Sequence, residues 1–323
     1  FVGSYSGYNQ TNSAYNVYLG YSAGHGSSGA TAHFNIGIGY QALKDILSGN
    51  NNIAIGYQAA DNLETGHSNI VIGNSALTTD QDGTTSVIIG HEAGGTLTGT
   101  TDNVFIGYHS GYSLDGTADN LAGVVAIGME AFEGHGDTTS DANNTVAIGR
   151  QALKDITTGS DNVAIGYQAG LAITTSNQNT MIGYQALKEH VGGGSNIAIG
   201  PNAMDQTAGS SAATSAYNIA IGRDALGGDW ADSTSDKNIA IGVFAMDAVL
   251  NDANNNIGIG YNSLGALTEG DQNVAIGTDS GLLLTTGGNN VLIGYQAGDG
   301  CTANSTMTLI GAEAGTAINS NNA

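Results

Sequence analysis

The sequence predicts an all-β fold: a parallel β-solenoid (β-roll) of about 18 coils with a basic 17-residue repeat, forming a single array over residues 1–323. The main observation is a recurring glycine, usually preceded by Ile, that occurs eighteen times; eleven of the seventeen spacings are 17 residues and the others run from 18 to 22. A second observation is Val, Ile or Thr two residues before that Ile, which is typical of a strand. The repeat glycines are Gly3, 20, 39, 56, 73, 90, 107, 128, 149, 166, 183, 200, 222, 242, 260, 277, 294 and 311.

Each strand is expected to direct its two flanking β-branched residues inward, so that the Ile rows of successive coils form a continuous core. The residue between them then points outward. It is Ala in eight copies, at positions 54, 126, 147, 164, 198, 220, 240 and 275, and it is often a larger apolar residue elsewhere. Because a strand that is apolar on both faces is normally covered on both, we expect another copy of this chain on the outer face, in a homotrimer or higher homo-oligomer.

The remaining repeat positions have structural interpretations. Ala or Ser stands three residues after every repeat glycine, which indicates a tight inward corner, and the glycine itself is expected in a conformation that a side chain would forbid. Asn stands four residues before the glycine in thirteen of seventeen copies and predicts either a hydrogen-bonded ladder or a turn. Tyr follows the glycine in eight copies, and this stripe predicts rings stacked coil on coil or, alternatively, a sugar-binding surface.

Composition excludes several classes of partner. The net charge is −22 with only six Lys and Arg, so binding to nucleic acid or to an anionic membrane is not expected. No run of 18 apolar residues occurs, so no membrane insertion is expected. The single cysteine, Cys301, allows no disulfide framework and is expected as a small buried filler or a solvated thiol. Because the chain starts inside a repeat and shows no capping units, we expect a segment of a longer fibre protein.

The repeat resembles two known groups. "NVAIGYQAG" (162–170) and "NIAIGPNAM" (196–204) resemble the head repeats of trimeric autotransporter adhesins, and more closely the "IGYQAL" repeats of tail-fibre-like proteins. The resemblance runs from Phe1 to about Gly315 and implies a homotrimeric β-roll in the shaft or head of an extracellular attachment fibre, on a cell surface or a virion tail. The 17-residue turn is longer than that of adhesin heads, so handedness and subunit number do not carry over.

Reactive side chains point to no enzyme. The seven histidines lie at different positions of the repeat; His91 and His109 follow neighbouring glycines at offsets of one and two and are interpreted as solvated turn residues. No cofactor is expected, apart from Ca²⁺ in one oxygen-rich turn, where the candidate ligands are Asp229, Asp232 and Asp236.

The longer turns are where a partner would bind this segment, since insertions at one phase of a repeat emerge on one side of a solenoid. The candidate contact residues are Trp230, Asp137 and Asp141. The sequence thus predicts a non-enzymatic spacer that projects a binding tip for attachment. The alternatives are a receptor- or glycan-binding module that acts through the inserted loops, and an ice-binding solenoid, for which the Thr pairs are intermittent.

Overall fold

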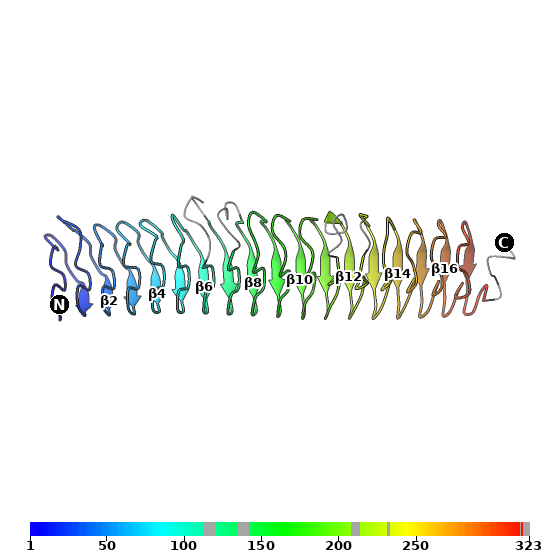
Figure 1. Ribbon diagram of the computed structural model, residues 1–323, viewed down its shortest axis with the longest axis horizontal. Coiled ribbons are helices and arrows are strands. Elements are labelled where there is room, and N and C mark those ends of the chain that lie inside the picture. Colours follow the sequence, from blue (N-terminus) through cyan, green and yellow to red (C-terminus); the bar gives the residue numbers. More distant parts are fainter. Residues whose placement is uncertain (113–120, 135–141, 208–213, 231–232, 317, 319–323) are drawn as a thin grey trace. The chain divides into compact units, whose positions relative to one another are not determined.

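The computed structural model describes residues 1–112, 121–134, 142–207, 214–230, 233–316 and 318. The chain divides into two compact units, Phe1–Asp161 and Asn162–Ala323. Each unit is a stack of coils, and each coil contributes one short strand (Figure 1). No α-helix occurs in the described ranges, and thus none that could cross a membrane.

All seventeen strands are three residues long and end on the residue before a repeat glycine. The first unit holds β1 (Val17–Leu19), β2 (Ile36–Ile38), β3 (Ile53–Ile55), β4 (Ile70–Ile72), β5 (Val87–Ile89), β6 (Val104–Ile106), β7 (Val125–Ile127) and β8 (Val146–Ile148). The second holds β9 (Val163–Ile165), β10 (Thr180–Ile182), β11 (Ile197–Ile199), β12 (Ile219–Ile221), β13 (Ile239–Ile241), β14 (Ile257–Ile259), β15 (Val274–Ile276), β16 (Val291–Ile293) and β17 (Thr308–Ile310).

Within each unit every strand pairs in parallel with the next, at the same repeat position. Ile53 lies beside Ile70, for example, and Ala54 beside Val71. The first copy of the repeat, which contains Gly3, forms no named strand; it makes one parallel bridge, between Val2 and Leu19. The predicted fold class is therefore confirmed within each unit. The prediction of one uninterrupted array stays a prediction.

The expected orientation of the strands is wrong, because the middle residue points inward. Ala54, Ala164 and Ala240 are fully buried, whereas Ile165 and Ile276, expected in the core, are 37% and 36% exposed. The buried–exposed pattern is the same in β2 to β16, with the middle residue buried and both flanking residues partly exposed. The Ile and Val rows thus form the outer face of the sheet.

The reason lies in the side chains of the wall opposite the strand. The wall that returns after the repeat glycine fills most of the interior with its own side chains, such as Leu43 and Ile46. A small residue on the strand opposite is then enough to close the core at normal packing density. Cys301 occupies the same inward row as Ile46, seven residues after the repeat glycine, and is fully buried, as a small filler would be.

The predicted roles of glycine and asparagine are confirmed. Gly56 has φ +144°, and a Cβ there would collide with the carbonyl oxygen of Gly73 in the next coil. Asn52 does both things that the sequence allowed. Its Nδ2 donates to Oδ1 of Asn35 in the preceding coil (3.1 Å) and to the Gly66 carbonyl (2.8 Å), so one side chain links coils and holds a turn.

Candidate functional site

The structure places the Trp230 side chain in the interior, not at the surface. It is only 2% exposed, and its Nε1 donates to the Leu226 carbonyl at 3.2 Å. This corrects the expectation that Trp230 contacts a partner. Its side chain points into the core, and the buried Leu250 stands at the same repeat position in the following coil. The other candidate contacts, Asp137 and Asp141, lie outside the described residues.

The calcium candidates are only partly described. Asp229 is exposed, Asp236 is half-buried, and Asp232 lies outside the described ranges. Oδ1 of Asp236 accepts a hydrogen bond from the Ala216 amide at 2.8 Å. The calcium site at this turn stays a prediction.

The outer face of the sheet is a surface that every coil extends by one strand. We define the outer strand face of each unit as the first and third residues of every strand, together with the residue after the repeat glycine. Of the eighteen first and third residues in the second unit, sixteen are Ile or Val and two are Thr; none is charged. Single exposed apolar residues are normal on proteins, but a continuous apolar surface of this kind marks an interaction site.

Tyrosine rings line the edge of this face where the repeat has Tyr after the glycine. Tyr40 stacks on Tyr21 at 5.3 Å and on Tyr57 at 5.0 Å between ring centroids, and Tyr184 stacks on Tyr167 at 5.3 Å. The predicted stacking is therefore confirmed where neighbouring coils both carry Tyr at this position. The rings remain 41–52% exposed in Tyr21, Tyr40, Tyr57 and Tyr184, so they extend the apolar surface.

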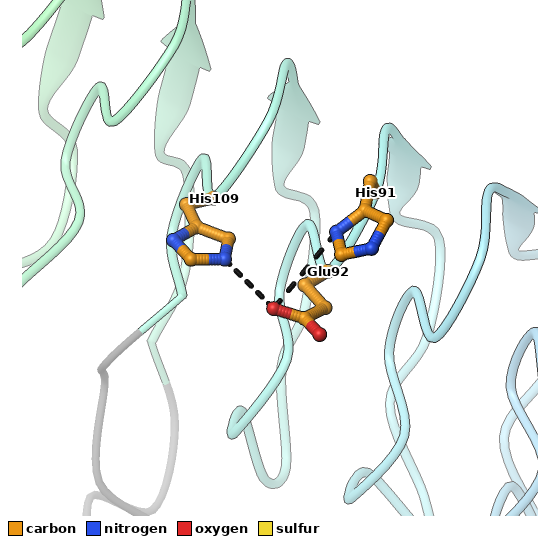
Figure 2. A group of neighbouring side chains, drawn as sticks. All are labelled: His91, Glu92 and His109. Atoms are coloured by element: carbon orange, nitrogen blue, oxygen red, sulfur yellow. Dashed lines mark hydrogen bonds and ion pairs between the residues drawn. The ribbon is translucent and has the colours of Figure 1, made fainter.

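A second feature is a cluster of two histidines and a glutamate on neighbouring coils of the first unit. Figure 2 shows His91 and Glu92 after β5 and His109 after β6, with both rings turned toward the Glu92 carboxylate. Nε2 of His109 lies 2.7 Å from Glu92 Oε2, and Nδ1 of His91 lies 3.9 Å from the same oxygen. One ligand atom from each residue falls within 4.8 Å of the others. The side chains of His91, Glu92 and His109 are 48%, 33% and 18% exposed.

Further groups hold the His109 ring in place. The ring stacks on Tyr108 at 3.9 Å and on Tyr112 at 4.2 Å between centroids. On its far side, Nδ1 lies 3.5 Å from Oε1 of Glu133. Glu133 is in turn paired through Oε2 with Nζ of Lys154, at 2.9 Å.

Lys154 and Glu130 complete this charged network. Nζ of Lys154 donates to Glu130 Oε2 at 2.6 Å. Burial lowers the pKa of Lys154, but its hydrogen bonds with Glu130 and Glu133 outweigh burial and hold that pKa above its ordinary value. Hydrogen bonds from Gln151 and Lys154 hold the pKa of Glu130 below its usual range. Lys154 and Glu130 therefore stay charged at neutral pH.

Glu92 also lines a polar groove of about 370 Å³, whose walls include Asp61, Thr79 and Tyr112. Burial raises the pKa of the Asp61 carboxyl, and the nearby Lys44 ammonium opposes that rise. A small polar molecule or a hydrated ion fits a groove of this size, and the His–Glu–His cluster stands beside it.

Sequence reasoning missed this cluster because it compared histidines by their repeat position. His91 and His109 occupy different positions, one and two residues after their glycines, and so did not align. Glu92 and His109 do share a position, exactly 17 residues apart, and stacked coils bring such residues into contact. Comparing every reactive residue type at one offset, rather than histidines alone, would have found the pair.

No protein-family model matches this chain, and neither the comparison with curated proteins nor that with solved structures finds a match. A function for this chain therefore has to rest on its own surfaces and side-chain clusters.

Proposed function

We propose that this chain is a non-enzymatic structural segment of an extracellular attachment fibre, and that copies of it associate through the outer strand face. The observation that carries the proposal is that the first and third strand residues of that face are Ile, Val, Leu or Thr in both units, with no charged residue among them. The resemblance of the repeat to those of adhesin heads and tail fibres supports an extracellular fibre.

The extent of the face supports association. Nine strands at ~4.8 Å spacing span about 38 Å, and five residues along the chain span about 13 Å, so the outer strand face of the second unit covers on the order of 500 Å². That is at the upper end of the largest apolar patch found on a typical monomer, about 300–600 Å². Because the same face recurs on every copy, the simplest cover for it is a second copy.

Charge supports the same arrangement. The net charge is −22, yet no Asp or Glu occupies a first or third strand position. The acidic residues that repel one another between copies therefore lie on other surfaces, and the outer strand face can be buried without desolvating a carboxylate. A coil held by interstrand hydrogen bonds and a dry core then acts as a stiff spacer.

The test is the assembly mass of the chain and of two matched variants. The double variant Ile199→Lys/Ile221→Lys places two charges on neighbouring strands of the outer strand face, where both side chains are already partly exposed. The control is Val249→Lys, a change at a 47% exposed side chain in a turn away from that face.

Mass photometry and analytical ultracentrifugation should show an oligomer for the native chain and for Val249→Lys, and a lower mass for the double variant. Circular dichroism should show that all three fold alike. A native chain that stays monomeric at concentrations of tens of micromolar (about 6 kcal/mol of association or less) would refute the proposal.

The glycan-binding alternative has one observation in its favour, the half-exposed tyrosine stripe of Tyr21, Tyr40 and Tyr57. Stacked, flat aromatic surfaces also suit the apolar faces of sugars. A glycan array probed with the native chain and with Tyr40→Ala distinguishes the two roles: loss of a specific signal in Tyr40→Ala supports binding, and no signal from the native chain leaves the spacer role alone.

A further inference from the structure

We propose that His91, Glu92 and His109 bind one divalent transition-metal ion of the zinc class. The proposal does not rest on the fibre function, since it is argued only from three side chains of the first unit, of which His91 follows a repeat glycine and so belongs to the outer strand face. Two imidazole nitrogens and one carboxylate oxygen are a ligand set that Zn²⁺ accepts, with water in the remaining position. The same set is poorly suited to Ca²⁺ or Mg²⁺, which prefer oxygen ligands alone.

The two distances from the Glu92 carboxylate to the histidines are close to those of a loaded site. Ligands about 2.0 Å from a tetrahedral Zn²⁺ lie about 3.3 Å from one another. Glu92 Oε2 lies 2.7 Å from one histidine nitrogen and 3.9 Å from the other, so each distance differs from that value by about 0.6 Å. Because His91 is 48% exposed, rotation of its ring about the side-chain bonds brings it to the ion without moving the backbone.

The surroundings of His109 favour metal binding. A metal-ligating histidine commonly directs its other ring nitrogen to a carboxylate, which fixes the tautomer and makes the ligand more basic. Here Glu133 Oε1 faces Nδ1 of His109 at 3.5 Å, while Nε2 faces Glu92. Tyr108 and Tyr112 stack on the ring and hold its plane. A metal ion would replace the proton that Nε2 shares with Glu92.

Comparison with other coils of this chain shows that the cluster replaces a neutral arrangement. Two residues after the glycine, the repeat often has Gln, and these residues stack: Gln58 donates to Gln41 at 3.2 Å, and Gln185 to Gln168 at 2.8 Å. At the coils of β5 and β6 the same ladder position holds Glu92 and His109. An ion pair alone would explain these two residues. It does not explain His91, whose ring faces the same carboxylate oxygen from the position that Tyr occupies in other coils.

The test is zinc binding to residues 1–323, purified without a histidine tag and freed of metal with a chelator. Isothermal titration with ZnCl₂ should show one site, and Zn²⁺ should raise the melting temperature, because a ligand that binds only the folded state stabilises it. His91→Ala and His109→Ala should each weaken binding by more than about tenfold. The control is His67→Ala, which removes an exposed histidine of the same unit that is remote in sequence from the cluster.

Glu92→Gln is the sharpest variant, because Gln is the residue that the chain itself has at this position in the coils of Gln58 and Gln151. It should fold and melt like the native chain without metal, yet bind Zn²⁺ at least tenfold more weakly. Glu133→Gln should weaken binding by about tenfold through His109 alone. Cobalt(II) in place of zinc should give the visible absorption of a tetrahedral N,O site in the native chain and not in His109→Ala. Zinc affinity that is unchanged in His91→Ala and Glu92→Gln, or no measurable binding by the native chain, would overturn the assignment.

Discussion

Replacement of Asn273 by Ala tests how far the asparagine ladder holds the coils together. Asn273 lies in an uninterrupted part of the ladder, between Asn256 and Asn290. Its Nδ2 donates to Oδ1 of Asn256 at 3.0 Å and to the Gly287 carbonyl at 2.9 Å. Its Oδ1 accepts from the amide and the Nδ2 of Asn290, at 3.1 and 2.9 Å.

The size of the effect follows from what the variant leaves unpaired. Asn290 Nδ2 keeps its bond to the Asn304 carbonyl, at 2.8 Å. The Gly287 carbonyl and the Asn290 amide lose the bonds described above, and both residues are buried. A buried polar group without a partner costs about 1–3 kcal/mol, so Asn273→Ala should lower the free energy of unfolding by about 2–6 kcal/mol.

A graded variant separates donor from acceptor. In the first unit the same ladder position holds Ser86, whose Oγ accepts from the Asn103 amide at 3.3 Å. Asn273→Ser should therefore keep an acceptor for Asn290 and lose the donor to Gly287, giving about half the loss of Asn273→Ala. The control is Asn251→Ala, where the side chain makes one exposed bond, to Glu269 at 3.1 Å.

The assay is urea unfolding followed by circular dichroism, together with hydrogen exchange of the amides in β15 and β16. Exchange is needed because each coil of a repeat array contacts only its neighbours, so the loss can be local. If Asn273→Ala changed neither measurement by more than Asn251→Ala does, about 0.5 kcal/mol, the ladder would not stabilise the stack.

Three further predictions concern the backbone and two titrating side chains. Gly56→Ala should cost more than about 2 kcal/mol in thermal melts, because its Cβ would strike Gly73, whereas Gly29→Ala, also at positive φ but in open space, should cost less. Burial, with Asp224 and Asp205 adding to it, raises the pKa of Asp247 to about 6. The protonated carboxyl therefore stabilises the fold below its unfolded pKa of about 4, and this contribution is lost as pH rises through 6. Asp247→Asn should accordingly raise the melting temperature at about pH 7 and not at about pH 4; an equal rise at both would contradict this. Burial lowers the pKa of His190 to about 4, so its contribution is present above about pH 6.5 and is lost as pH falls toward 4. His190→Leu should remove that acid-side loss, and an unchanged difference in melting temperature between about pH 7 and pH 5 would count against the assignment.

The sequence predicted the repeat, the strand positions and the structural role of the glycines, because each depends on local chemistry that recurs every coil. The strand orientation could not be read in the same way. With Ile on one face and Ala on the other, hydrophobicity favours burial of Ile. The structure buries Ala164 and leaves Ile165 37% exposed, because the returning wall supplies the bulk of the core.

The proposed functional surfaces also depend on which strand residues face outward. Because the apolar Ile rows face outward, association between copies is still expected, but through residues such as Ile199 and Ile221 rather than through Ala198 and Ala220. The His–Glu–His cluster was not predicted, because it arises from residues that only the stacking of coils brings together. The prediction that Trp230 lies at the surface was wrong, because a lone tryptophan in a long turn can equally pack into the core.

The orientation of the strands can be inferred from a second pattern in the sequence, in which the size of the middle strand residue is matched to that of a residue on the opposite wall. Where the middle strand residue is large, the residue four after the repeat glycine tends to be Gly: a Cβ on Gly24 or Gly111 would collide with the buried ring of Tyr18 or Phe105. Where the strand has Ala126, that position instead holds the buried ring of Phe132. Such exchange of volume occurs only between side chains that share one closed space, since a core has a fixed volume to fill. A residue that faced solvent would have no reason to be matched to the opposite wall, so this pairing identifies the middle residue as the inward one.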